Sequence, residues 1–414
     1  MNRLGLLVVL FSFLLLPFTG TSQHFAGGRF ANMPTALNNV PQPGVSTFAQ
    51  QSSYQGTLIG QDSTNKIITT AVPFLSVTPD ARSAGLGDAG VALSPDANSG
   101  YWNAGKLAFI DKAYGGSASY TPWLGKIVND MWIFYLSGFY KINHTQTVAA
   151  SMKYFNYGQI NFRDANNQPL GSYTPRDVAF DVTYSQLLTE HLGIGGSLRY
   201  IYSNLTGAIS TGFDAKAGEA VAVDLGVFYT KPMVSSNSTL SLGASISNLG
   251  SKITYSGAAS KNFIPTNLKI GGAYKTDLDQ LNSLTFLLDF NKLMVPSPRP
   301  GSEQEPMLKG VFGSFTDAQG GFKEEMQEIT TSVGVEYWYN RAFAGRLGYF
   351  YEAKDKGDRK YLTSGVGFRY EKFALDIAYL VPTNNRNSPL AETIRFTIMM
   401  HIDPKKKEEE AVTD

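Results

Sequence analysis

From about residue 111 onward, apolar and polar side chains alternate along short stretches of the chain. In the stretch 191–202 every second position is apolar, and the positions between them include Ser197 and Arg199. The apolar positions are Leu192, Ile194, Leu198, Tyr200 and Tyr202. Stretches 220–229, 332–339 and 392–402 repeat the pattern. Because successive side chains of a β-strand point to opposite faces, this alternation predicts strands with one apolar and one polar face.

Roughly fourteen segments of this kind follow one another, most of them about 9 to 12 residues long. They begin near Tyr114, Trp132, Thr147, Val178, Leu192, Val221, Leu240, Leu268, Leu284, Thr331, Phe343, Leu362, Phe373 and Ile394. This length suits a tilted strand that crosses a bilayer, and an even number suits a bacterial outer-membrane barrel. The pattern therefore predicts an all-β membrane protein, with a fourteen-stranded antiparallel β-barrel over residues 111–403.

The connections between these segments alternate between short and long. Short ones lie near residues 143, 190, 340 and 371. Long ones span 158–176, 204–218, 249–266 and 291–328. Outer-membrane barrels have short periplasmic turns and longer extracellular loops. The rhythm predicts an integral outer-membrane protein whose N- and C-termini are both periplasmic.

Charged side chains sit at mid-strand positions of the polar face. They are Asp181, Arg199, Asp224, Asp289, Glu336, Arg346, Arg369, Asp376 and Arg395. In the dry core of a soluble β-sandwich, each such charge would cost several kcal/mol unless it were well paired. We therefore expect outer-membrane lipid on the apolar face and the charges in the lumen. There, Asp181 and Glu336 are predicted to form structural ion pairs with Arg199 or Arg346, in preference to an acid–base pair.

Composition narrows the chemistry that the chain can carry. The 35 Lys and Arg residues balance 34 Asp and Glu residues, so no basic excess indicates nucleic acid as a partner. The chain has no cysteine, which removes disulfides, thiolate metal sites and cysteine nucleophiles. Its 4 histidines form no recognisable catalytic or metal-binding motif. We predict no catalytic residue, no metal and no cofactor.

The two ends of the chain differ from the barrel region. Residues 1–22 combine Arg3 with an apolar stretch and small residues, which predicts a secretory signal peptide rather than a transmembrane anchor. Residues 23–70 are rich in Gly, Asn, Gln, Ser, Thr and Pro and predict an irregular leader. Residues 404–414 carry a run of Lys and Glu and predict a charged periplasmic tail.

Between the leader and the first strand, residues 85–90 read G-x-G-x-x-G, the fingerprint of a dinucleotide-binding turn. Such a turn needs a strand before it and a helix after it, but Pro79 and Pro95 leave room only for short helices. Glycine also permits close backbone packing. We interpret residues 71–110 as a plug inside the barrel, its turns capped by Asp80, Asp88, Asp96 and Asn98.

Residues 75–109 also resemble the start of PorV, an outer-membrane component of the type IX secretion system. The matching residues are Asp80, Ala81, Arg82, Gly85, Gly87, Asp88, Gly90, Ser94, Pro95, Asp96, Ser99, Trp102, Asn103, Lys106 and Phe109. PorQ and, more remotely, the FadL transporters of hydrophobic solutes are similar. The chain has Ala104 and Gly105 where these families commonly have Pro-Ala after Trp-Asn, which weakens the FadL match most.

The resemblance implies a non-enzymatic secretion component. PorV-like proteins bind cargo that carries a C-terminal sorting domain and take it from the large translocon barrel. They deliver it to a surface attachment complex with a PorU-like sortase and PorQ- and PorZ-like partners. The alternatives are a FadL-like transporter of small hydrophobic molecules and a lipid-modifying enzyme barrel.

The connection 291–328 is rich in proline and methionine. Proline lowers the entropy that a loop loses on docking, and exposed methionine adapts to varied partners. We predict that this loop binds cargo or the translocon; the alternative is a solvated loop with no dedicated partner. The predicted binding residues are Met294, Pro296, Pro298, Arg299, Pro300, Pro306 and Met307.

Overall fold

The computed structural model describes residues 66–124, 130–163, 166–205, 216–256, 261–299, 301–384 and 393–402. The predicted signal peptide, most of the predicted leader and the predicted charged tail lie outside these ranges. All the described residues belong to one unit, Gln61–Asp414. Within them, no helix combines the length and the apolar character that a membrane-crossing helix needs.

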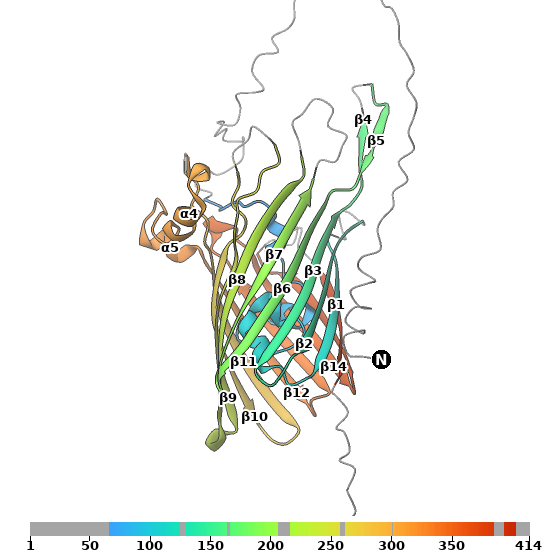
Figure 1. The fold of residues 1–414 in the computed structure, drawn as a ribbon, viewed down its shortest axis with the longest axis vertical. Helices are drawn as coiled ribbons and strands as arrows, with labels where there is room; N and C mark the ends of the chain where they lie inside the picture. Colours follow the sequence, from blue (N-terminus) through green and yellow to red (C-terminus); the bar gives the residue numbers. More distant parts are fainter. Residues whose placement is uncertain are drawn as a thin grey trace, which may run out of the picture. The chain divides into compact units, whose positions relative to one another are not determined.

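Fourteen antiparallel strands form a closed ring, in which each strand pairs with its neighbours in the sequence of barrel strands and β1 pairs with β16 (Figure 1). The predicted fourteen-stranded barrel is therefore confirmed. The barrel strands are β1 (Tyr114–Pro122), β2 (Met131–Lys141), β3 (Gln146–Tyr157), β6 (Arg176–Thr189), β7 (Leu192–Asn204), β8 (Gly218–Met233), β9 (Ser238–Gly250), β10 (Asn267–Asp277), β11 (Asn282–Leu293), β12 (Ile329–Tyr339), β13 (Phe343–Tyr351), β14 (Lys360–Tyr370), β15 (Phe373–Pro382) and β16 (Ile394–Ile402).

The two ends of the barrel differ, as the sequence predicts. At one end, which we call the short-turn end, β6 joins β7 and β14 joins β15 through two residues each. At the other, the long-loop end, three connections contain structure of their own that the sequence did not predict. One holds the hairpin of β4 (Ile160–Arg163) and β5 (Pro169–Tyr173), the second holds η5 (Ser302–Gln304), α4 (Met307–Gly313) and α5 (Phe322–Gln327), and the third holds η6 (Lys354–Lys356). At the short-turn end, η4 (Val234–Ser236) lies between β8 and β9.

Apolar side chains cover the outside of the ring, and polar ones point inward. On β7 and β13, Leu198 and Leu347 are 60% and 67% exposed, while the neighbouring Arg199 and Arg346 are buried. A wall of this kind is stable when hydrocarbon covers the outside, because the strands satisfy one another's backbone hydrogen bonds. The alternation read from the sequence therefore gave the correct face for each of these charges.

Residues 73–110 lie within the ring rather than in its wall, and we call them the inner segment. They form η2 (Pro73–Ser76), α2 (Ala81–Ala84), α3 (Ser99–Trp102) and η3 (Ala104–Phe109), visible in Figure 1 among the strands. Helix α2 contacts β14, β15 and β16, whereas η3 contacts β3, β6, β7 and β8. Contacts with opposite parts of the wall show that the strands surround this segment.

The inner segment runs from one end of the barrel to the other. Near its start, the amide of Ala71 donates to the carbonyl of Phe263 in a long connection. At its finish, Lys141, the last residue of β2, donates to the carbonyl of Ile110 at the short-turn end. The last described residue, Ile402, also lies there, opposite Tyr114. The described chain thus starts and finishes at opposite ends of the barrel, whereas the sequence predicts both termini on the periplasmic side. The termini themselves lie outside the described residues.

Candidate functional site

The inner segment is tied to itself through Asp80. One carboxylate oxygen accepts from the Ser83 amide at 2.9 Å and so caps α2, while the other accepts from the Trp102 indole nitrogen at 2.7 Å. Burial and the nearby charge of Asp96 raise the pKa of Asp80. A single acidic side chain therefore joins α2 to α3.

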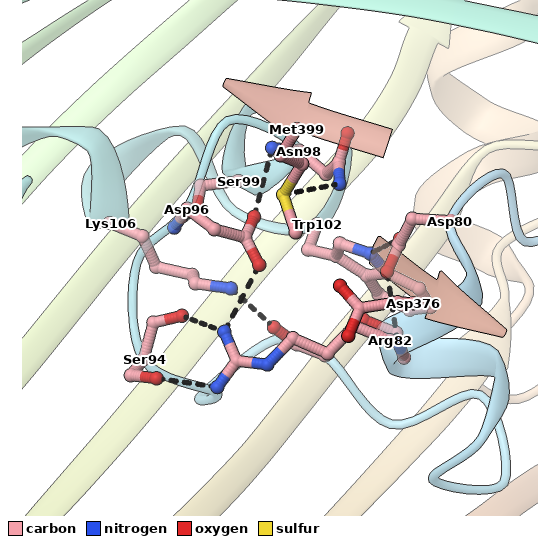
Figure 2. A network of polar contacts seen from close by, with 12 residues as sticks. Asp80, Arg82, Ser94, Asp96, Asn98, Ser99, Trp102, Lys106, Asp376 and Met399 are labelled. Atoms are coloured by element: carbon pink, nitrogen blue, oxygen red, sulfur yellow. Dashed lines mark hydrogen bonds and ion pairs between the residues drawn. The ribbon is translucent and has the colours of Figure 1, made fainter. Parts of the chain in front are cut away.

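Arg82 is the centre of a buried polar network that links the inner segment to the wall. Its Nε and Nη2 donate to the two oxygens of Glu336 on β12 at 3.0 and 2.8 Å. Figure 2 shows the guanidinium also directed at Asp96 and Ser94, with 3.1 Å from Nη1 to the Asp96 carboxylate and 2.7 Å from Nη2 to the Ser94 hydroxyl. A guanidinium that makes two parallel bonds to one carboxylate fixes orientation as well as position.

The network continues along the wall through alternating charges. Arg346 donates to Glu336 at 2.8 Å and to Asp376 at 2.8 Å, and Arg369 donates to Asp376 at 3.0 Å. The predicted Glu336–Arg346 ion pair is confirmed. The predicted pair of Asp181 and Arg199 also forms, at 2.5 Å. Each buried carboxylate here has a cationic partner, which offsets the cost of burying its charge.

The glycine motif mediates close contact between the inner segment and the wall. Gly87 has a φ of 69°, and a Cβ there would lie 2.7 Å from the backbone of Tyr349. Its amide donates to the Thr363 hydroxyl at 2.8 Å, and the Gly90 amide donates to Asp289 at 2.7 Å. Amides that a dinucleotide turn would offer to phosphate are thus bonded to barrel strands, in agreement with the steric interpretation.

Two of the predicted turn caps are wrong. Asp88 bonds the wall instead, accepting from Tyr361 at 2.5 Å and from Arg395 at 3.2 Å. Asn98 does not cap α3, and its side chain accepts from Ser137 at 3.1 Å. Both side chains point toward the barrel wall, where Tyr361, Arg395 and Ser137 donate hydrogen bonds to them.

The remaining motif residues lie where they hold turns together. Asp96 accepts from the Asn98 amide at 2.9 Å, and Asn103 caps η3 by accepting from the Gly105 amide at 3.0 Å. Asn103 also donates to the Val227 carbonyl on β8 at 2.9 Å. Gly85 packs against Gly365 of β14, where an added Cβ would lie 3.1 Å from its Cα.

Lys106 is a buried cation for which the sequence analysis predicted no role. Its ammonium donates to the Gly90 carbonyl at 2.8 Å. Burial lowers its pKa to about 8, although the charge of Asp96 opposes this change. Burial alone would raise the pKa of Asp96, but Arg82 and Lys106 lower it below the ordinary value. Across the described ranges, no group of three His, Cys, Asp or Glu side chains could hold a metal ion.

The long connection 294–328, which we call the outer segment, does not present all of its predicted binding residues. Met294 and Pro296 are buried, so the expectation that Met294 adapts to partners as an exposed side chain is wrong. Pro298 and Pro306 are exposed, and Arg299 and Met307 are half-buried. Pro300 lies outside the described residues. Packing of the segment against the barrel rim buries its first residues, which composition alone could not reveal.

A second buried ion cluster fixes the outer segment to the barrel rim. Lys292 of β11 donates to Glu325 at 3.0 Å and to Glu328, and Lys356 bonds Glu324 and Glu328 at 2.8 Å each. Burial would raise the pKa of Glu324, but hydrogen bonds from Lys356 and Lys66 lower it to about 2. Lys66 thereby joins the start of the described chain to the same cluster.

The sequence of the barrel and inner segment identifies the family. Residues 60–300 match the family model described as type IX secretion system protein PorV. The chain belongs to the PorV family. This PorV-family protein is an integral outer-membrane β-barrel.

Solved outer-membrane structures are similar at low identity, and no curated protein matches. The toluene transporter TbuX of Ralstonia pickettii is 12% identical, with 78% of this chain and 98% of that chain covered and a TM-score of 0.44. The toluene transporter TodX of P. putida is 13% identical, with 78% and 99% covered and a TM-score of 0.45. A Pseudomonas aeruginosa FadL homologue is 11% identical, with 81% and 99% covered and a TM-score of 0.42.

Two residues of this PorV-family protein bind the backbone of the inner segment, a role that the sequence analysis did not predict. Lys153 of β3 donates to the carbonyls of Leu75 and Val77, and Asp289 accepts from two inner-segment amides. The alternation placed Asp289 on the polar face, but it did not indicate its partners, and Lys153 was not among the predicted lumenal charges. The signal that could have found them is chemical: a lysine that faces the lumen can donate to free carbonyls of the inner segment, and an aspartate can accept from its free amides.

Proposed function

We propose that this PorV-family protein binds secreted cargo through its C-terminal sorting domain. It passes the cargo from the large translocon barrel to a surface attachment complex that contains a PorU-like sortase and PorQ- and PorZ-like proteins. Family membership supports the secretion role. The observation that supports the mode of action is the inner segment, which lies within the ring and is bonded to its wall by buried ion pairs and backbone amides. A segment held there favours a docking platform over a conduit.

We assign the long-loop end to the cell exterior, because outer-membrane barrels carry their longer loops there. The short-turn end and the charged tail that follows β16 then face the periplasm. On this assignment the outer segment offers Pro298, Arg299, Pro306 and Met307 to cargo or translocon. The proposed role requires binding and release only, and no catalytic group.

A deletion strain tests the function. Surface display of a reporter that carries a C-terminal sorting domain is expected to fall to background without the protein and to return with the plasmid-borne gene. Uptake of a hydrophobic solute such as toluene is measured in the same cells and is expected not to change. Retained display together with lost uptake would replace the proposal with the FadL-like transporter.

Site-specific photocrosslinking in intact cells tests the partner surface. A crosslinker at Pro306 is expected to capture translocon, sortase or cargo. The matched control is Leu278, which is 59% exposed in the turn between β10 and β11 at the short-turn end. Equal capture at both positions, or capture only at 278, would remove the assignment of the outer segment.

A further inference from the structure

The outer segment has two different faces, and one of them packs against the protein. In α4, Gly310 and Val311 are buried, and a Cβ at Gly310 would lie 2.5 Å from the Phe263 ring. In α5, Glu324 and Glu325 are buried in the ion cluster at the rim. These contacts fix how both short helices are rotated.

The opposite face is apolar and exposed. Phe322 is 81% exposed, Phe312 is 58% exposed, and Leu308, Phe315 and Met326 are exposed as well. Leu308 and Phe312 lie one turn apart on α4, and Phe322 and Met326 lie one turn apart on α5. A soluble surface tolerates single exposed apolar residues, but several of them on two neighbouring helices indicate a binding surface. We call this set of five residues the aromatic face.

The distribution of charge on this surface differs from that of an ordinary solvated loop. The exposed charged residues of 306–328 are Lys309 and Lys323, next to the aromatic face in sequence. The acidic residues Glu324, Glu325 and Glu328 of the same segment are buried against Lys292 and Lys356. Residues 306–328 therefore expose apolar and cationic side chains, with Asp317 half-buried, and this part of the outer segment complements an anionic amphiphile. The exposed carboxylate of the outer segment, Glu303, precedes α4.

The position of the segment points to the same ligand. Figure 1 shows α4 and α5 projecting beyond the barrel wall at the long-loop end. The segment follows β11 and precedes β12, and the outward side chains near those strand ends, Phe290 and Val333, are both 44% exposed on the lipid-facing wall. The aromatic face is thus close along the chain to the apolar belt of the barrel.

We propose that the aromatic face lies in the interface of the outer leaflet, with its phenylalanines among acyl chains and Lys309 and Lys323 against phosphate groups of anionic lipid. Helices that combine an apolar face with basic residues bind lipid surfaces in this way, and each lysine near an anionic surface strengthens the attraction. The contact holds the outer segment at a fixed height above the membrane.

The absence of native cysteine in the chain allows a direct test by spin labelling. Phe322→Cys is labelled in the full-length barrel, reconstituted in phosphatidylcholine vesicles with or without phosphatidylglycerol. Leu347→Cys, on the outward wall, serves as the lipid control, and Leu170→Cys, 59% exposed on the β4–β5 hairpin, serves as the water control. Relative accessibility to oxygen and to a water-soluble nickel complex reports the depth of each label.

We expect the oxygen-to-nickel ratio at 322 to be severalfold higher than at 170 and to approach that at 347. Phosphatidylglycerol should raise it further, and Lys309→Gln with Lys323→Gln should abolish that increase. A ratio at 322 equal to that at 170 in both vesicles overturns the proposal. A label that leaves water only when purified translocon or sortase is added assigns the face to a protein instead. An unchanged ratio with phosphatidylglycerol overturns the anionic part.

Discussion

The inner and outer segments are attached to the barrel in similar ways, but one lies inside the ring and the other at its rim. Both are irregular chain attached to a β-barrel, and both are attached through buried ion clusters, Arg82 with Glu336 in one and Lys356 with Glu324 in the other. The inner segment is enclosed by strands on opposite sides, so each of its turns must match the wall. The outer segment has a wall on one face only and leaves aromatic side chains exposed on the other. Enclosure demands close fit, whereas a single contact face leaves a surface available for binding.

The largest effect is expected from breaking the inner cluster. Arg82→Ala leaves Glu336 and Asp96 buried without this cation, and removing one partner of a buried pair costs about 3–5 kcal/mol. We expect that loss in the free energy of unfolding, measured by urea titration in detergent. Arg299→Ala, which removes a partly exposed pair with Glu305, is the control and should cost about 0–1 kcal/mol. Similar losses for both variants would contradict a special role of the inner cluster.

Close fit is tested next by three glycines. Gly87→Ala adds both a left-handed strain and a clash with Tyr349, and we expect about 1–3 kcal/mol of destabilisation. Gly301 has a φ of 81° but no atom within 4 Å of an added Cβ, so Gly301→Ala isolates the strain. Gly345→Ala adds neither. Unfolding titrations should rank the losses in that order; a loss at Gly301 equal to that at Gly87 would remove the packing argument.

Acid should loosen the outer segment. The depressed pKa of Glu324 means that its ion pairs stabilise the fold fully above the ordinary value of 4.5, and that this stabilisation is lost as the pH falls toward about 2. Hydrogen exchange measured after brief incubation at each pH, and corrected for its intrinsic rate, should show severalfold less protection of α5 across that window. Lys356→Met should weaken the pH dependence. Constant protection down to pH 2 would show that other contacts hold α5.

The smallest effect sharpens the contrast between the two faces of the outer segment. Phe322→Ser removes a largely exposed ring and should change the free energy of unfolding in detergent by no more than about 0.5 kcal/mol. Val311→Ser, on the buried face of α4, should cost about 2 kcal/mol. A large loss from Phe322→Ser would mean that the ring stabilises the fold and is not kept for binding.

Local alternation was enough to predict most of the barrel. Strand starts such as Leu192 and Phe343 were correct because period-two patterning acts within a strand. The pairs Asp181–Arg199 and Glu336–Arg346 were also within reach, because each lies directly opposite in the register of adjacent strands. Resemblance to a family, rather than patterning, indicated secretion.

Alternation of apolar and polar residues could not predict contacts between residues that are far apart in the sequence. Arg82 reaches Glu336 across 254 positions, and no periodicity links them. Burial of Met294 depends on how the outer segment packs on the rim, which its proline content does not specify. Asp88 and Asn98 were assigned to turns because local capping is the commonest use of such residues, but strands far along the chain supplied their partners.

The path of the inner segment has a consequence for assembly. It passes through the ring from the long-loop end to the short-turn end and continues directly into β1, whose other neighbour, β16, is the last strand to be synthesised. The seam between β1 and β16 therefore closes beside a segment that contacts strands on opposite sides of the ring. Two hydrogen bonds join the inner segment to β16: the Ala81 amide donates to the Thr397 hydroxyl, and Arg395 donates to Asp88. Closure of the β1–β16 seam and seating of the inner segment are therefore linked through the same strand.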